Sequence, residues 1–451
     1  MKKFVCAATI TLGLMMSAVF PLRAQSALPA GWPARVELGM SDAPGGAAAM
    51  KATAPFAFRY QYLSGGANTG SGWATWNTNG DFARFYIEDS VANGIIPVFT
   101  YYQMFQSQPG GSSESDAVNN NLNNTATMTA YYNDLKLFFQ KAGAFPGKLV
   151  VLHVEPDLWG YVQNRSGDNA ATATARVSET GLSELAGLPS NVSGFARAIV
   201  KLRDTYAPNV ALGYHISVWG TGNDIVLSNP PDATLDSLGT RAATFFTSLS
   251  ASFDVAFAEF SDRDSAFYQN IYGDGGQHWM DAEDFRRLGR FLGRFYSATG
   301  KRIVMWQIPL GNTKMRTVDN TWGHYQDNRP EWFLDEDSRS HLLAYRDAGI
   351  VAFLFGGGAS GTTCACNGSG DGVTNPAAIN GNNMASEAAP AGTAPASVVR
   401  GTTPTLVTPY AADDDGGFFR WRAYRYYQDG PTPLGASTAP PSPPTNVRII
   451  R

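Results

Sequence analysis

Eight short apolar runs, separated by amphipathic stretches, constrain the fold of this 451-residue chain more than any other feature. Such alternation is typical of βα units around a parallel sheet. Apolar residues recur at helical spacing in the intervening stretches Asp81–Ala92, Tyr131–Lys141, Gly194–Tyr206, Ala282–Ala298 and His341–Asp347. The predicted strands are Arg35–Met40, Phe56–Leu63, Ile95–Tyr101, Leu149–Glu155, Val210–Ser217, Phe253–Phe260, Arg302–Ile308 and Ile350–Phe355.

Eight strand–helix alternations predict a single domain over residues 30–430, an α/β protein with a (β/α)8 barrel of the TIM type. A doubly wound sheet is the alternative, but no Gly-rich phosphate-binding fingerprint follows the first strand. A long insertion rich in Gly, Asn and Ala, Cys364–Pro409, follows strand eight, and the aromatic stretch Phe418–Gln428 then predicts the last helix of the barrel. Residues 431–451 form a Pro-rich tail.

Residues 1–24 have the pattern of a secretory signal peptide: basic Lys2-Lys3, an apolar run Phe4–Phe20 and a small residue at the end. The run is short for a membrane anchor, so we expect a secreted or periplasmic protein with no membrane contact. The net charge of -4, more negative once the basic leader is removed, argues against nucleic acid as a partner. We expect a monomer. Cys364 and Cys366 fit a structural disulfide or a free pair better than a metal site, and the sequence leaves open which of the two forms is present.

Side chains alternate along a strand, so each run divides into a set that faces the pore and a set that faces the helices. In the fourth and fifth runs, this alternation directs Glu155, Asp157 and His215 toward the pore, because the apolar residues between them must face the helices. The same rule places Arg59 and Gln61 of the second run inside the barrel.

Carboxylates gather where two of the runs end, and in a barrel the loops at these ends make the active site. Glu155 and Asp157 flank Pro156 at the end of run four and are expected to project to the same side. Glu259 ends run six, and Asp262 follows in the loop. Alternation would send Glu259 outward with the apolar residues of its run, so a bulge or twist would have to turn it in. Pairing with Arg263 is the structural alternative for Asp262.

Aromatic and amide side chains crowd the same predicted rim. Sugar rings present C–H faces that stack on aromatic rings, and their hydroxyl groups bond to amides and acids. We therefore expect a carbohydrate substrate. The candidate substrate-binding residues are His215, Trp219, Trp159, Tyr101, Gln307, Trp306 and Asn312.

The segment Leu149–Leu158, with Val162-Gln163-Asn164 after it, resembles the motif of glycoside hydrolase family 6 cellulases, whose core reads V-I-E-P-D-S-L before a V-T-N-like turn. Asn209–His215 and the following Trp219 are similar to the next strand of that family, and the resemblance extends from about Asp81 to Asn223. It implies that Asp157 is the general acid, that His215 and Trp219 bind sugar, and that hydrolysis inverts the anomeric carbon. Tyr101-Tyr102-Gln103 stands where the family has an Asp-rich motif.

These patterns predict a secreted glycoside hydrolase that cleaves a β-glucan-like polysaccharide or oligosaccharide with paired carboxylates. Asp157 is the expected acid, because repulsion from Glu155 would raise one pKa of the pair. Glu259, and after it Asp262, are the candidates for the second carboxylate. No cofactor and no metal are expected.

Two alternatives stay open. One is a non-catalytic carbohydrate-binding barrel, which the aromatic rim would serve equally well. The other is a metal-assisted hydrolase that uses Glu155, Asp157, His215 and Glu259.

Overall fold

The computed structural model describes residues 26–310, 327–336, 338–357 and 415–435. The predicted signal peptide, Asn312, the whole insertion Cys364–Pro409 with Cys364 and Cys366, and residues 436–451 lie outside the described residues. Within the described part, no helix is long and apolar enough to cross a membrane.

Eight parallel strands pair in the order of the sequence, and the last pairs with the first, so the sheet closes into a barrel. This confirms the predicted (β/α)8 barrel, and each predicted run overlaps the strand observed there. The strands are β1 (Glu37–Ser41), β2 (Phe58–Leu63), β3 (Ile96–Tyr101), β4 (Val150–Val154), β5 (Val210–His215), β6 (Val255–Glu259), β7 (Ile303–Ile308) and β8 (Ile350–Phe355).

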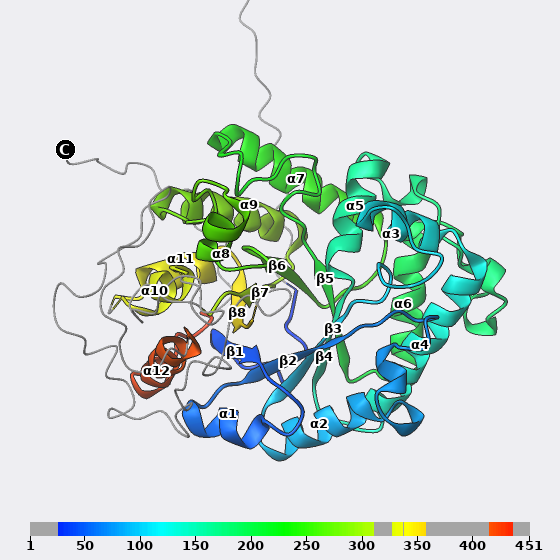
Figure 1. Ribbon diagram of the computed structural model, residues 1–451, viewed down its shortest axis with the longest axis horizontal. Coiled ribbons are helices and arrows are strands. Elements are labelled where there is room, and N and C mark those ends of the chain that lie inside the picture. The colour runs from blue at the N-terminus through cyan, green and yellow to red at the C-terminus, as the bar shows by residue number, and fades with distance from the viewer. Residues whose placement is uncertain (1–25, 311–326, 337, 358–414, 436–451) are drawn as a thin grey trace, which may run out of the picture.

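Helices surround the barrel, and the chain passes around it once, from blue to red in Figure 1. The helices of the first half are α1 (Ala47–Thr53), α2 (Phe82–Ala92), α3 (Glu114–Leu122), α4 (Thr125–Gly143), α5 (Pro156–Ser166) and α6 (Val192–Tyr206). Those of the second half are α7 (Asp232–Ser248), α8 (Ser265–Phe267), α9 (Ala282–Thr299), α10 (Arg329–Leu334), α11 (Ser340–Asp347) and α12 (Asp415–Gln428). The five helical stretches predicted from periodicity lie in α2, α4, α6, α9 and α11.

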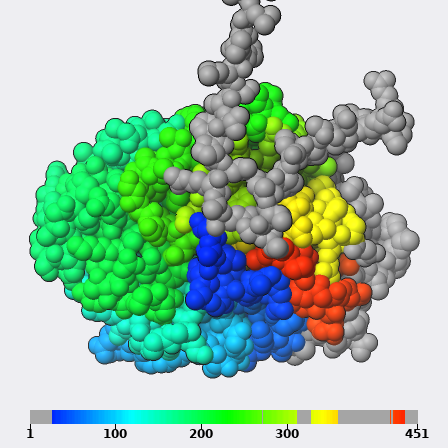
Figure 2. Space-filling view, turned by 180° about the vertical axis from the view of Figure 1, so that it is seen from behind, coloured from blue at the N-terminus to red at the C-terminus, as the bar shows by residue number. Residues whose placement is uncertain are grey.

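Helix α12 covers the seam between the first and last strands, as its aromatic sequence predicts. Phe419 stacks on Phe355 of β8 at 4.0 Å between ring centroids. Tyr426 donates to the carbonyl of Val36, and Tyr427 donates to the carboxylate of Glu37. The blue N-terminal segment and the red helix therefore lie side by side on the face shown in Figure 2.

The pore is filled by side chains, many of them aromatic, in a cluster separate from the larger core between strands and helices. Gly213 of β5 leaves room for this filling, because a Cβ atom there would lie 2.3 Å from the ring of Phe257. The cluster includes Phe58, Tyr60, Val98, Val151, Ala211, Val255, Phe257, Val304, Trp306 and Leu354.

The predicted inward direction of Arg59 and Gln61 is wrong. Tyr60 and its neighbours in register face the pore, so Arg59 points outward to the helical layer. Its guanidinium lies 2.6 Å from Asp42 and 2.8 Å from Asp89, and 3.9 Å from the centre of the Tyr86 ring. Buried ion pairs and a cation–π contact satisfy this charge outside the barrel.

The predicted outward direction of Glu259 is also wrong. Val255 and Phe257 belong to the pore cluster, whereas Ala256 and Ala258 face the helices. Glu259 therefore points inward by simple alternation, with no bulge in β6.

Candidate active site

The carboxyl end of β4 turns directly into a helix, and this turn separates the two acids that end the strand. Glu155 has φ 48°, a left-handed conformation that costs energy for a residue with a Cβ. Pro156 then begins α5, as Pro often does at the first position of a helix. Asp157 lies in the first turn of α5, where the helix dipole favours an acid.

Glu155 does not share a face with Asp157, contrary to the prediction. Its carboxylate is buried and accepts from the backbone N–H groups of Gln103, at 3.1 Å, and Met104, at 3.2 Å. Burial raises the pKa of Glu155 to about 8, against the lowering effect of these hydrogen bonds. Glu155 thus holds the loop after β3 in place, and its carboxyl group is engaged by the backbone N–H groups of that loop.

The partner of Asp157 is Glu114, the first residue of α3, which sequence reasoning missed. The two carboxyl groups hydrogen-bond to each other, and this contact raises the pKa of Asp157 and acts to lower that of Glu114. Tyr102 donates to Glu114 and, at 3.2 Å, to Asp157, and Tyr161 donates to Glu114 at 3.3 Å. Burial and the neighbouring Glu114 raise the pKa of Asp157 to about 7. Burial also raises the pKa of Glu114.

Glu259 and Asp262 approach the same region from β6 and the loop after it. Burial raises the pKa of Glu259 well above 4.5, and the nearby charges of Asp157 and Asp262 raise it further. Asp262 forms an ion pair with Arg263 and accepts from Tyr268, so its structural alternative is observed. Four carboxyl groups from the ends of β3, β4 and β6 therefore interact at one mouth, as expected for a barrel active site.

Two histidines lie beneath these acids. His153 stacks on Phe257, with 4.2 Å between ring centroids, and its Nε2 lies 3.0 Å from Nδ1 of His215. Both are fully buried, and burial lowers the pKa of His215 to about 3 and that of His153 well below 6.5. His215 is thus a neutral side chain under the mouth. A substrate could reach it only after displacement of what covers it.

Strand β7 brings two of the predicted residues into the pore. Gln307 has φ 53° at an irregularity in the pairing with β8. Its Oε1 accepts from Tyr62 at 2.5 Å, and its Nε2 lies 3.4 Å from the carbonyl of Asp262. Trp306 is 2% exposed and lies edge-on to His153. Gln307 therefore ties the rim at β2 to the loop after β6.

Of three aromatic residues that the sequence predicts to bind substrate, two lie away from the mouth and one lies at its rim. Tyr101 and Trp159 lie in the core between strands and helices, fully buried, where Tyr101 donates to Asp134 at 2.6 Å. They are not placed to touch a substrate, because each projects from the helix-facing side of its segment. Trp219 is half-buried at the rim and packs on Tyr161 at 4.7 Å between ring centroids. Trp219 thus borders the acids through Tyr161.

Two signals in the sequence could have revealed Glu114. Ser113 caps α3 by accepting from the N–H of Asp116, and acids occupy the first turn. The stretch also follows a strand end, where site residues are expected. It was missed because α3 has few apolar residues, so periodicity did not mark it.

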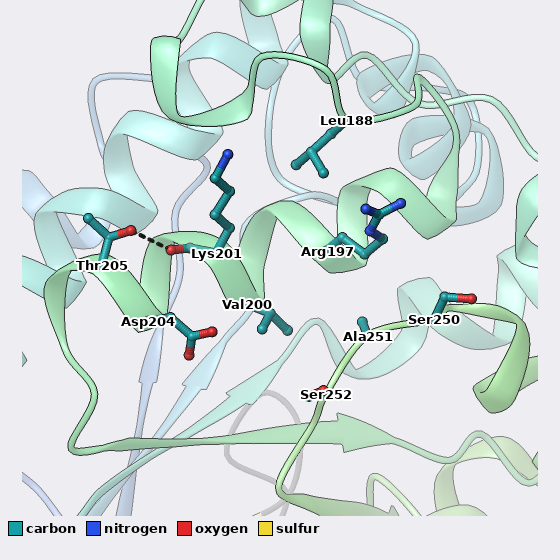
Figure 3. Close-up of a pocket in the computed structure, with 9 residues that line it drawn as sticks. All are labelled: Leu188, Arg197, Val200, Lys201, Asp204, Thr205, Ser250, Ala251 and Ser252. Atoms are coloured by element: carbon teal, nitrogen blue, oxygen red, sulfur yellow. Dashed lines mark hydrogen bonds between the residues drawn. The ribbon is translucent and has the colours of Figure 1, made fainter.

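Among the described residues, no group of three or more His, Cys, Asp and Glu is arranged to hold a metal ion. A surface hollow of about 370 Å³ lies elsewhere, on α6 and the segment before β6 (Figure 3). It adjoins the amino ends of β5 and β6, opposite the acids, and contains none of the predicted site residues. Its lining residues are Leu188, Arg197, Val200, Lys201, Asp204, Thr205, Ser250, Ala251 and Ser252.

No protein-family model and no curated protein matches the sequence. The solved structures that match are mostly glycoside hydrolases of several families, and family 6 is one of them. GH26C from Muricauda sp. MAR_2010_75 is 11% identical, with a TM-score of 0.42, and the match covers 79% of this chain and 88% of that chain. An exo-beta-1,4-mannosidase from Opitutaceae bacterium strain TAV5 is 9% identical, with a TM-score of 0.42 and coverage of 73% and 53%.

The GH6 enzyme from Orpinomyces sp. Y102 is 12% identical, with a TM-score of 0.28 and coverage of 55% of this chain and 59% of that chain. The chain thus spans little more than half the length of the mannosidase and of the GH6 enzyme. All three TM-scores are below 0.5.

Proposed function

We propose that the chain is an exported glycoside hydrolase that cleaves a β-glucan-like polysaccharide or oligosaccharide with Asp157 and Glu259. The observation that carries this proposal is the position of these acids at the carboxyl ends of β4 and β6, on the same mouth of the barrel and near enough for the charge of Asp157 to raise the pKa of Glu259. Glycoside hydrolysis needs a carboxylic acid that protonates the leaving oxygen and a carboxylate that activates water or attacks carbon. Two carboxyl groups on alternate strands can flank one bond in this way.

Asp157 fits the acid. Its hydrogen bond to Glu114 holds a proton on Asp157, and its pKa of about 7 keeps that proton available near neutral pH. Tyr102 contacts both carboxyl groups and so fixes their orientation. After the proton leaves with the sugar, Glu114 and Tyr102 remain beside the new carboxylate.

Glu259 fits the second carboxylate, and Asp262 is the next candidate. One strand, β5, lies between β4 and β6, and this spacing leaves a gap across which a water molecule could attack; we therefore propose inversion. Because these acids interact, the protonation of one depends on the protonation of the others. Glu259 acts as the base in those molecules in which it has lost its proton. Trp219 and Tyr161 provide a stacking surface beside the acids.

The roles can be assigned with substrates that differ in their leaving group. We expect Asp157→Asn to lose most activity on a natural oligosaccharide but to retain activity on an aryl glycoside, whose departure needs no proton. We expect Glu259→Gln to lose activity on both. Undiminished hydrolysis of the oligosaccharide by folded Asp157→Asn would refute the assignment. Proton NMR of the first product anomer tests inversion.

A non-catalytic carbohydrate-binding barrel is the second candidate. It is favoured by the raised pKa values of Asp157, Glu114 and Glu259, because protonated acids can donate to sugar hydroxyls and cannot act as bases. Binding of an oligosaccharide without release of reducing ends, across the whole pH range of stability, would establish this candidate.

A further inference from the structure

Six large apolar side chains are exposed in the described part of the chain, and five of them lie in segments that follow the carboxyl ends of strands. The five are Trp76, Phe105, Leu227, Ile271 and Tyr272. They come after β2, β3, β5 and β6, so they lie at the end of the barrel that carries the acids. The sixth, Phe85, belongs to helix α2. Exposed apolar side chains of this size therefore gather around the mouth.

Phe105, in the loop after β3, lies one ring contact away from the proposed acid. Its side chain is 36% exposed, and its ring centroid is 6.1 Å from that of Tyr102. Tyr102 in turn donates to Glu114 and, at 3.2 Å, to Asp157. Phe105 therefore presents a ring to solvent directly beside the side chains that hold Asp157.

Tyr272 has the corresponding position after β6. It is 56% exposed, and its ring centroid lies 5.5 Å from that of Tyr268, which donates to Asp262. Phe267 packs edge-on to the ring of Tyr272 at 5.3 Å, and the guanidinium of Arg263 lies 5.6 Å from the ring centre. The ring is thus exposed but held by three neighbours, so little ordering is needed when a ligand stacks on it.

The two rings belong to different sides of the mouth. The strands β4 and β5 lie between β3 and β6, and helices α3 and α8, which follow β3 and β6, lie on either side of β5 in Figure 1. Three strand spacings of about 4.8 Å separate β3 from β6, or about 14 Å along the wall. Asp157, at the end of β4, lies between the two loops. A single sugar unit is too short to contact both rings, whereas a chain of several units can do so.

We propose that the substrate is an extended polysaccharide chain, stacked on Phe105 on one side of the cleaved bond and on Tyr272 on the other, so that internal bonds are cut. The inference rests on the proposed function and names the length of substrate and the type of cleavage at that site. Sugar rings present C–H faces to aromatic rings, and stacking removes apolar surface from water on both partners. A ring on each side favours chains that continue past the acids in both directions.

The test of binding compares cellobiose, cellotetraose and cellohexaose by titration calorimetry on the full chain, with Asp157→Asn as the background so that the ligand stays intact. We expect affinity to rise with length, and the hexamer to bind about tenfold tighter than the dimer, as two stacked rings would contribute. No gain in affinity from dimer to hexamer, or no binding of the hexamer, would overturn the proposal.

Three matched variants in the same background locate the effect. Phe105→Ala and Tyr272→Ala should each weaken the hexamer several-fold. Phe85→Ala removes a ring of similar exposure, 43%, from helix α2 and should change nothing. Equal effects of the three variants would contradict a chain bound across the mouth. Melting temperatures are measured in parallel: a loss of stability with unchanged affinity would show that the ring packs within the protein, and this also overturns its role.

The products of the wild-type chain separate this inference from the proposed function. On a soluble β-glucan, cleavage of internal bonds lowers viscosity early, when few reducing ends have been released. Length-dependent binding without release of reducing ends would support the bound chain and refute the hydrolase. Release of reducing ends from chain termini alone, with no early loss of viscosity, would support the hydrolase and overturn the cleavage of internal bonds.

Discussion

Replacing Glu114 by Gln tests whether the contact between Glu114 and Asp157 keeps the proton on Asp157, the proposed catalytic acid. The pKa of Asp157 is raised from 3.8 to about 7, with burial as the largest cause and Glu114 as the second. Such a rise corresponds to about 4 kcal/mol, since one pH unit is about 1.4 kcal/mol. The share of Glu114 is less than half, so its removal should lower the pKa of Asp157 by about one unit, or about 1.4 kcal/mol.

The assay is the pH dependence of kcat/KM, whose alkaline limb reports the acid that must keep its proton. Glu114 is a like charge that raises the pKa of Asp157, so the alkaline limb of Glu114→Gln should move about one unit toward lower pH. Glu88→Gln on α2, which removes an exposed acid paired with Arg84, should leave the limb in place. A folded Glu114→Gln variant with an unmoved alkaline limb would refute the reasoning.

Three further predictions concern the pore, the rim and the β3 loop. Gly213→Ala should lose at least about 1–3 kcal/mol of unfolding free energy in urea, because its Cβ would overlap the ring of Phe257; unchanged stability would contradict the tight filling of the pore. Trp219→Ala should raise KM for oligosaccharides several-fold with little change in melting temperature, because the ring that packs on Tyr161 is half-buried at the rim; an unchanged KM would remove it from the binding surface. Burial holds the pKa of Glu155 at about 8 in the folded chain, against an ordinary 4.5, so its contribution to stability is full below pH 4.5 and is lost as pH rises through 8. Glu155→Gln should therefore lose less stability than the wild type between pH 5 and pH 8, by on the order of 2 kcal/mol in urea titrations, and parallel losses would exclude this role.

The barrel itself could be predicted because strands buried on both faces are short continuous apolar runs, and eight of them alternate with helices. The same property hid the direction of side chains. In β6, the apolar residues were assumed to face the helices, although Phe257 fills the pore and the two Ala residues face outward. When both faces of a strand are buried, hydrophobicity predicts where the strand lies, but it does not predict which side chains face the pore and which face the helices.

The site could be predicted only in part, because its geometry depends on where the backbone leaves the regular strand. Asp157 and Glu259 were identified at strand ends, where position alone suffices. Glu155 and Asp157 were expected to act together because alternation continues through a strand, but the left-handed turn at Glu155 begins a helix and separates them. The missing partner, Glu114, comes from a polar helix with no apolar stripe to mark it.

Because Glu155 and Asp157 are separated, the end of β4 involves three carboxyl groups with different roles: Glu155, Asp157 and Glu114. Glu155 holds the loop after β3 through the N–H groups of Gln103 and Met104, and that loop carries Tyr102 and leads into α3. The same loop therefore delivers both the hydroxyl group and the acid that contact Asp157. Loss of the Glu155 anchor would let the loop move and would separate Glu114 from Asp157, so the proton on Asp157 depends on an acid that never touches it. In the strained conformation at φ 48°, Glu155 ends β4 and its carboxyl group accepts from the backbone N–H groups of Gln103 and Met104 in the neighbouring loop.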